Sequence, residues 1–101
     1  RYPVWYLHNL GHAYFLAGRY EEAIAILERA LNRNPNFWPA HVYITASYVE
    51  LGREEEARVE AQELLKIHPH FTMERGRQRL PYKDQRVLER LGDNLRKAGL
   101  K

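Results

Sequence analysis

The sequence predicts an all-α fold in which antiparallel helix pairs stack into a solenoid, an α-α superhelix. The first observation is an internal repeat: shifting the 101-residue chain by 34 positions aligns residues 4–37 with residues 38–71 and gives nine identities. The second is helical periodicity, because apolar residues recur every three to four positions in each half of the unit. The third is a glycine near the middle of each copy and a proline near its end. Together they predict two helix pairs of the same design.

The first repeat reads as two helices joined by a tight turn. Residues 4–17 carry one apolar stripe, and Gly18 can take the left-handed backbone conformation that ends such a helix. Residues 20–33 restart the period. Pro35 ends the pair, because proline cannot continue a helix and disfavours helical geometry at the residue before it.

The second repeat keeps this scheme, with predicted helices over residues 38–51 and 54–67. In the first copy the small residues Gly11 and Ala23 are predicted to form the contact between the two helices, because helix axes approach closely only where side chains are small. Thr45 takes the place of Gly11 in the second copy.

The repeated unit resembles the tetratricopeptide repeat. In the first copy the residues that carry the resemblance are Leu10, Gly11, Tyr14, Gly18, Tyr20, Ala23, Leu27, Ala30 and Pro35. The second copy keeps Tyr48, Gly52, Ala57, Leu64 and Pro69 and departs at Thr45, Glu54 and Ala61. The resemblance implies a non-catalytic protein-interaction scaffold whose partner lies in a concave groove lined by the first helix of each pair.

Residues 72–101 do not extend the repeat and are predicted to form a degenerate helix pair. Thr72 can cap a short helix that runs to about Arg79, and Asp84 can cap a final helix that stops at Gly99. Solenoids need such an end piece to cover the apolar edge of their last repeat. The apolar face of the final helix is predicted to comprise Val87, Leu88, Leu91, Leu95 and Ala98.

Composition limits the class of protein. A chain of 12.0 kDa is expected to form one domain, residues 1–101, and it has no cysteine, which favours a reducing compartment such as the cytoplasm. No apolar run approaches the roughly 20 residues that span a bilayer. Because the chain starts at Arg1 and enters an apolar pattern almost at once, we expect it to be the C-terminal fragment of a longer protein.

A second resemblance covers the C-terminal half. It is carried by Phe37–His41, Leu51–Ala57, His68–Phe71, Tyr82–Asp84 and Gly92–Leu100. These segments are similar to the end of a group of bacterial proteins. In that group a class III adenylate or guanylate cyclase domain, or a DNA-binding regulator, precedes tetratricopeptide repeats and a Leu-Arg-Lys-Ala-Gly-Leu tail. Asn94 departs from the group, which has glycine there. The resemblance implies a bacterial signalling parent.

Candidate catalytic residues are few. The two aspartates, Asp84 and Asp93, are nine positions apart on one predicted helix, whereas a cyclase holds two metal ions with paired aspartates. The only serine, Ser47, lies in mid-helix without a nucleophile-elbow motif, and there is no glycine-rich phosphate loop. The sequence therefore predicts no catalytic residue, no cofactor and no small-molecule substrate in this chain.

The repeat register predicts the two walls of the groove that the resemblance implies. The first wall would present Trp5, His8, Asn9, His12 and Phe15. The second would present Val42, Tyr43, Ala46, Val49 and Glu50. Aromatic and amide groups of this kind suit an extended or helical peptide segment of a partner protein.

One alternative concerns the histidines of the first wall. His8 and His12 are one helical turn apart, a spacing that can bring two imidazoles to one metal ion. The sequence offers no carboxylate or third ligand nearby, so we favour groove lining and predict no metal site.

Two alternative functions remain open. Apolar surface around Val4, Trp5 and Leu7 could pair two copies as a homo-oligomerisation module. Residues 1–71 have a net charge of −2 (seven Lys and Arg, nine Glu), whereas residues 72–101 have +5 (nine against four). A basic tail could meet phosphates of nucleic acid or another anionic partner. Its residues are Arg75, Arg77, Arg79, Lys83, Arg86 and Arg90.

Overall fold

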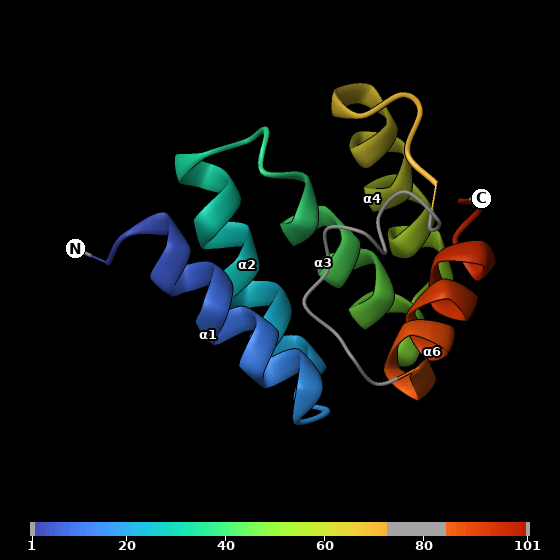
Figure 1. Cartoon of the computed structure of the whole chain (residues 1–101), viewed down its shortest axis with the longest axis horizontal. Helices are drawn as coiled ribbons and strands as arrows, with labels where there is room; N and C mark the ends of the chain where they lie inside the picture. The colour runs from blue at the N-terminus through green and yellow to red at the C-terminus, as the bar shows by residue number, and fades with distance from the viewer. Residues whose placement is uncertain (1, 73–84, 101) are drawn as a thin grey trace.

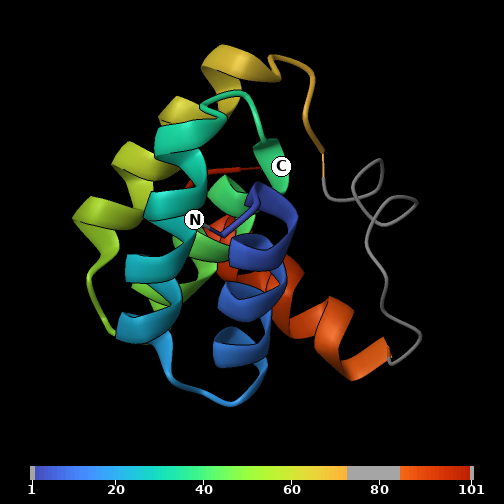
Figure 2. The ribbon, with the colours of Figure 1, turned by 90° about the vertical axis from the view of Figure 1, so that its left-hand side faces the viewer.

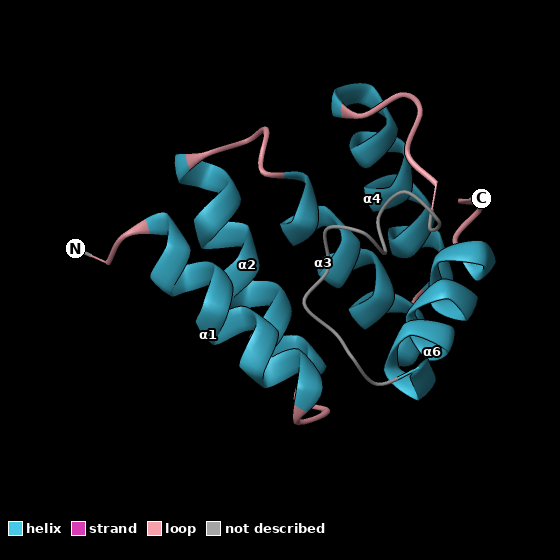
Figure 3. Ribbon diagram, viewed as in Figure 1, coloured by secondary structure: helices cyan, strands magenta, loops and turns pink. Residues whose placement is uncertain are grey.

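The computed structural model describes residues 2–72 and 85–100. The helices in these ranges are α1 (Val4–Leu16), α2 (Tyr20–Arg33), α3 (Trp38–Glu50), α4 (Glu54–Ile67) and α6 (Gln85–Lys97), as Figure 1 shows. Figure 3 draws only helices and loops over the same ranges. The all-α prediction is confirmed for the part of the chain that the structure describes.

The helices stack in consecutive pairs. α1 packs against α2, α3 packs against α4, and α2 packs against α3, so that the second pair continues the layer of the first. α6 lies against α3 (Figures 1 and 2). This arrangement is the helix-pair solenoid that the sequence predicts.

The turn inside each pair has the same geometry in both repeats. Gly18 and Gly52 each have a φ of +77°, a left-handed conformation that costs glycine little. The next residue bonds back across the turn: the amide of Arg19 lies 2.9 Å from the carbonyl oxygen of Tyr14. The equivalent bond of Arg53 in the second repeat has the same length. These bonds satisfy carbonyl groups at the helix end.

The close contact within the first pair corrects one detail of the prediction. A Cβ added to Gly11 would lie 2.5 Å from Cγ of Leu27, so the residue that faces this glycine most closely is Leu27 rather than Ala23. Ala23 is nevertheless fully buried. The absence of a side chain at position 11 lets a large side chain, not a second small one, fill the space between the helices.

The predicted cap is described only in part. The expected short helix after Thr72 and its break before Asp84 fall almost wholly outside the described residues. α6 itself ends as predicted, with Gly99 at a φ of +96° and the amide of Leu100 bonded to the carbonyl oxygen of Leu95 at 2.9 Å. The buried residues on its inner side are Leu88, Leu91, Leu95 and Ala98, while Val87 is half-buried. Among the described helices, none is both long and apolar enough to cross a membrane.

Candidate interaction surface

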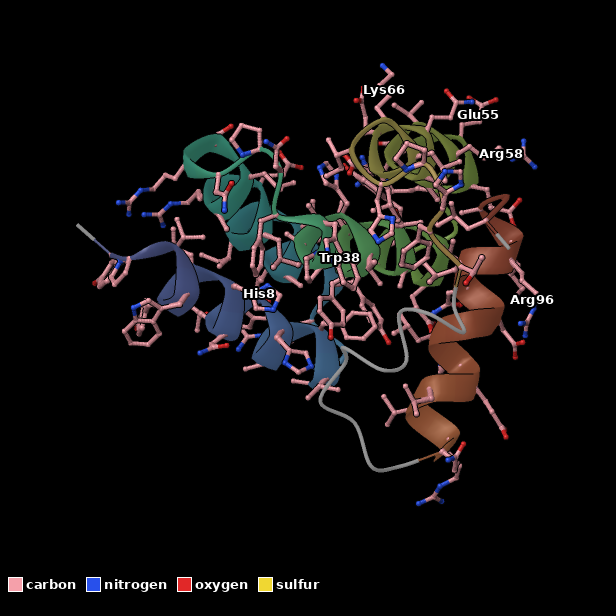
Figure 4. All side chains as sticks on the ribbon, turned by 45° about the horizontal axis from the view of Figure 1, so that its top comes forward. His8, Trp38, Glu55, Arg58, Lys66 and Arg96 are labelled. Carbon is pink, nitrogen blue, oxygen red and sulfur yellow. The ribbon has the colours of Figure 1, made fainter. Side chains whose placement is uncertain are left out.

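The predicted groove residues come from the first helix of each pair, α1 and α3. Both helices are uncharged over most of their length: there is no Asp, Glu, Lys or Arg from residue 2 to residue 18, nor from residue 34 to residue 49. Helical geometry brings residues three or four positions apart to one side. His8, His12 and Phe15 therefore share a side of α1. Figure 4 shows the labelled His8 on the side of α1 that faces α3.

Three rings of α1 meet one ring of α3. The centroid of Tyr43 lies 5.7 Å from that of His8, 4.8 Å from that of His12 and 5.3 Å from that of Phe15. Phe37, in the connection between the pairs, packs edge-on against His8 at 4.8 Å. These five residues form a continuous contact between the first and second pairs, which we call the ring layer.

The ring layer keeps its imidazoles neutral. The pKa of His8 is lowered from 6.5 to about 4, mainly by burial and to a smaller extent by the neighbouring His12. Burial also lowers the pKa of His12. Within the described part of the chain, the buried Nδ1 of His8 has no hydrogen-bond partner. Proton uptake by either ring is therefore opposed by the fold.

The geometry of the two imidazoles is that of stacked rings, with centroids 6.2 Å apart. Each also contacts the ring of Tyr43. Among residues 2–72 and 85–100, no three His, Cys, Asp or Glu side chains gather closely enough to hold a metal ion.

The predicted wall residues differ in exposure. Exposed members are Trp5, at 65%, and Asn9. Half-buried members are His8, His12, Val49 and Glu50. Buried members are Phe15, Val42, Tyr43 and Ala46. The surface that a partner can touch in this structure therefore lies on α1 and at the C-terminal end of α3.

Glu50, at the end of α3, holds α6 in place. Its carboxylate accepts two hydrogen bonds from the guanidinium of Arg90, at 2.5 and 2.7 Å, and one from the amide of Asn94 at 3.0 Å. Bonding to Arg90 lowers the pKa of Glu50 most, burial opposes this, and Asn94 lowers it further. Sequence reasoning missed Asn94, which is 4% exposed. The signal was a single amide within the apolar face of α6.

The chain matches a known protein family over the two repeats. A family model described as tetratricopeptide repeat matches residues 14–73, which is more than half of the chain. The chain belongs to the tetratricopeptide repeat family. A search of curated proteins gave no match. Tetratricopeptide repeats serve as protein-interaction scaffolds and are typically non-catalytic, so this chain carries an interaction fold.

Ahead of the matched region, three aromatic side chains are exposed just before and at the start of α1. Tyr2, Trp5 and Tyr6 are 56%, 65% and 38% exposed, and we call them the N-terminal aromatic cluster. The rings of Tyr2 and Tyr6 stack at 4.9 Å, and Trp5 lies edge-on to Tyr6 at 6.1 Å. The guanidinium of Arg33, at the end of α2, donates a hydrogen bond to the carbonyl oxygen of Tyr2. The cluster is therefore tied to the body of the repeat.

This cluster corrects the apolar edge that the sequence predicts. Leu7 was expected at the edge but is only 2% exposed, because it lies on the buried side of α1, one turn before Gly11. Val4 is half-buried. Tyr2 and Tyr6 were missed, although the run of aromatic residues around the start of the first repeat was a signal for them.

The predicted basic tail is only partly described in this tetratricopeptide fold. Arg75, Arg77, Arg79 and Lys83 lie outside the described residues. Arg86 and Arg90 lie on α6, and Arg90 is paired with Glu50. The nucleic-acid hypothesis stays a prediction.

Proposed function

We propose that this chain holds a peptide segment of another protein along α1 and the end of α3. The partner contacts Trp5 and Asn9 directly and reaches the half-buried His12, Val49 and Glu50. Behind them the buried members of the predicted walls give a rigid floor. These are Phe15, Val42, Tyr43 and Ala46.

The observation that supports this most is the ring layer beside two exposed groups of different chemistry. Trp5 offers a large aromatic anchor, and Asn9 offers an amide that can bond to a peptide main chain. A floor of packed rings loses little conformational entropy on binding, because those rings are already fixed. Since the surface carries no formal charge on α1, the partner segment is apolar or aromatic rather than strongly charged.

A selection of peptides displayed on phage, followed by fluorescence titration of the enriched sequences, tests this proposal. We expect Asn9→Ala and His12→Ala to weaken binding of the selected peptides by about tenfold. Val59→Ala is the matched control, because Val59 is 58% exposed on α4, away from the proposed groove. Equal affinity of Asn9→Ala, His12→Ala and the control would mean that peptides bind elsewhere.

We also propose that the parent is a bacterial cytoplasmic signalling protein with an adenylate or guanylate cyclase domain, or a DNA-binding regulator, ahead of the repeats. The support is the tail Leu95–Leu100 and its resemblance to that group. Leu95, Ala98 and Leu100 are buried, so packing alone also requires apolar residues there. Sequencing the reading frame upstream of Arg1 tests the idea. A frame with neither domain contradicts it.

A further inference from the structure

A small pocket lies where the C-terminal end of α1 approaches the first half of α6. Its volume is about 160 Å³, and residues of α1, α2, α3 and α6 line it. In Figure 1 the end of α1 and the start of α6 lie at the same, lower side of the molecule. Sites for cofactors and other small molecules are about 300 to 1,000 Å³, so this pocket has room for one side chain rather than for such a ligand.

The walls of the pocket are mainly apolar. α1 contributes Phe15, which is buried, and Leu16, which is 54% exposed. α6 contributes the half-buried Val87 and the buried Leu91. The ring of Tyr20 also lines the pocket and packs edge-on against Phe15, with ring centroids 5.8 Å apart. Leu16 and Val87 leave apolar surface in water, so a side chain that covers this surface is favoured.

The open side of this pocket is independent of what precedes α1. The 34-residue shift pairs Leu16 with Glu50. Glu50 is half-buried, and it is bonded by Arg90 and Asn94 of α6, a helix that follows both pairs. The register therefore places the cover of Leu16 later in the chain than α1. Its exposure is not that of a side which an earlier helix pair would cover.

The pocket continues the proposed peptide site. Asn9, His12 and Leu16 are separated by three and four positions, so they share one side of α1. Glu50 belongs both to the proposed site and to the lining of the pocket. A segment that lies along α1 from Asn9 toward the C-terminal end of the helix therefore reaches the pocket at Leu16.

We infer, on the basis of the proposed function, that the pocket takes one large apolar side chain of the partner segment, of the size of leucine or phenylalanine. The charged residues that the structure places in the lining, Glu50 and Arg90, are paired with each other. A charged side chain that enters therefore loses water without meeting an excess of opposite charge. An apolar side chain gains from its burial.

Arg90 makes the pocket suitable for a residue of a peptide. Its guanidinium has five N–H bonds, and it donates to Glu50 through Nε and Nη2. The side chain is 69% exposed, so further N–H groups are accessible from solvent. These groups can donate to main-chain carbonyl oxygens on either side of the inserted residue. The pocket therefore anchors the side chain, and Arg90 at its rim holds the backbone.

Fluorescence anisotropy titration of the phage-selected peptides tests the pocket through Leu16, whose exposure lets it change without loss of the core. We expect Leu16→Ala to weaken binding by about tenfold. We also expect the selected peptides to share a leucine or phenylalanine. Replacing that residue by alanine should weaken binding about tenfold to the original chain but only about twofold to Leu16→Ala. Val59→Ala, which changes a similarly exposed apolar residue on α4, should bind as the original chain does.

Filling the pocket covalently is the second measurement. The chain has no cysteine, so Leu16→Cys carries a single thiol. A benzyl group attached to this thiol through a disulfide should occupy the pocket and weaken peptide binding by about tenfold or more. A methyl group attached in the same way restores a side chain about the size of leucine, so its affinity should stay within about twofold of that of the original chain.

The outcomes separate this inference from the proposed function. If Asn9→Ala and His12→Ala weaken binding while Leu16→Ala and the benzyl adduct do not, the inference is overturned and the proposed function stands. If none of these changes weakens binding, the peptide site itself is wrong. Both are supported if all of them weaken binding and the methyl adduct does not.

Discussion

The two repeats share their turns but fill the space between their helices differently. In repeat one, Gly11 faces Leu27. The 34-residue shift puts Thr45 at the position of Gly11 and Ala61 at that of Leu27. Leu27, Thr45 and Ala61 are all buried, at 0 to 3% exposed. A small residue on the first helix goes with a large one on the second, and the reverse holds in repeat two. A third position changes in the opposite sense, because Ala30 of repeat one becomes Leu64, so leucine and alanine exchange places on the second helix.

In this chain, the two repeats fill the contact around positions 11 and 45 with different combinations of large and small residues. Interiors are close-packed, so an added side chain on one helix must be matched by a removed one on its neighbour. The hydroxyl of Thr45 bonds to the carbonyl oxygen of His41 at 2.7 Å, which satisfies its polar group inside the second pair. The residues that fill the contact within each pair therefore form a matched set. Exchanging one of them for its counterpart in the other repeat should lower the free energy of unfolding.

Replacing a residue of one matched set by its counterpart in the other repeat is expected to give the largest loss of stability. Leu27→Ala should cost roughly 2 to 5 kcal/mol of unfolding free energy, because it leaves a cavity beside Gly11. Gly11→Thr should cost about 1 to 3 kcal/mol, because its Cβ would lie far inside contact distance of Leu27. The double variant carries the residues of repeat two at both of these positions, so its loss should fall short of the sum by about 1 to 2 kcal/mol. Urea unfolding of the four proteins measures this coupling.

The control for this cycle is Ala25→Thr, at an exposed position of α2. It reports the helix-propensity cost of threonine alone, about 0.5 kcal/mol. If the losses of Gly11→Thr and Leu27→Ala simply add, the two residues do not form a matched set.

The second effect is a pH dependence of stability that arises from the histidines of α1. Where α1 carries His8 and His12, α3 carries Val42 and Ala46. His8 titrates near 6.5 when unfolded and near 4 in the fold, so the unfolded chain takes up the proton first as the pH falls. Stability is complete above about pH 6.5 and decreases toward pH 4. Between pH 7 and pH 5 the loss from His8 should be about 2 kcal/mol.

Urea unfolding at several pH values checks this expectation in His8→Phe, which keeps a ring but cannot titrate. Its stability should vary with pH by about 2 kcal/mol less than that of the original chain over the same range. Val59→Ala changes no titratable group and should leave the pH dependence unchanged. A pH dependence that is the same in all three proteins would show that the ring layer does not oppose protonation of His8.

The sequence was sufficient for features that depend on local conformation. Gly18 and Gly52 were predicted at the turns because few other residues adopt a positive φ there, and both adopt it. The helix bounds were predicted from the same glycines and from the prolines that end each pair. The partner of Gly11 was not predictable in this way, because a small residue marks a close approach on its own helix without specifying which residue faces it.

Long-range pairings were also beyond the sequence. Glu50 is predicted to line the groove, and the structure adds that it bonds to Arg90 and Asn94, which lie 40 and 44 positions later. No spacing rule links residues so far apart, since their contact depends on how α6 packs against α3. Tyr43 was placed in the groove wall by register, and its burial likewise depends on the rings that α1 brings to it.

The third prediction tests what the repeats share. Gly18→Ala and Gly52→Ala should each cost about 1 to 2 kcal/mol, because alanine is strained at a positive φ. An added Cβ would meet no atom within 4 Å at either site, so the cost is one of backbone strain and should be equal to within about 0.5 kcal/mol. Urea unfolding measures both. A clear difference between the two variants would mean that the turns are not equivalent, despite their identical φ.

The smallest effect is expected where the repeats differ at the end of their first helices. The register pairs Glu50 with Leu16, which is 54% exposed. Glu50→Leu places the residue of repeat one in repeat two and removes the three hydrogen bonds that hold α6. The melting temperature should fall by a few degrees, and the amides of α6 should exchange with deuterium several-fold faster while those of α2 do not change. Glu50→Gln, which keeps the shape and some of the bonding, should fall between the two.

Because the fold lowers the pKa of Glu50, its contribution is present above the ordinary value of 4.5 and is lost as the pH falls through the lower folded value. The difference between Glu50→Leu and the original chain should therefore shrink in acid. If α6 exchanges equally fast in all three proteins at neutral pH, apolar packing alone holds the last helix on α3.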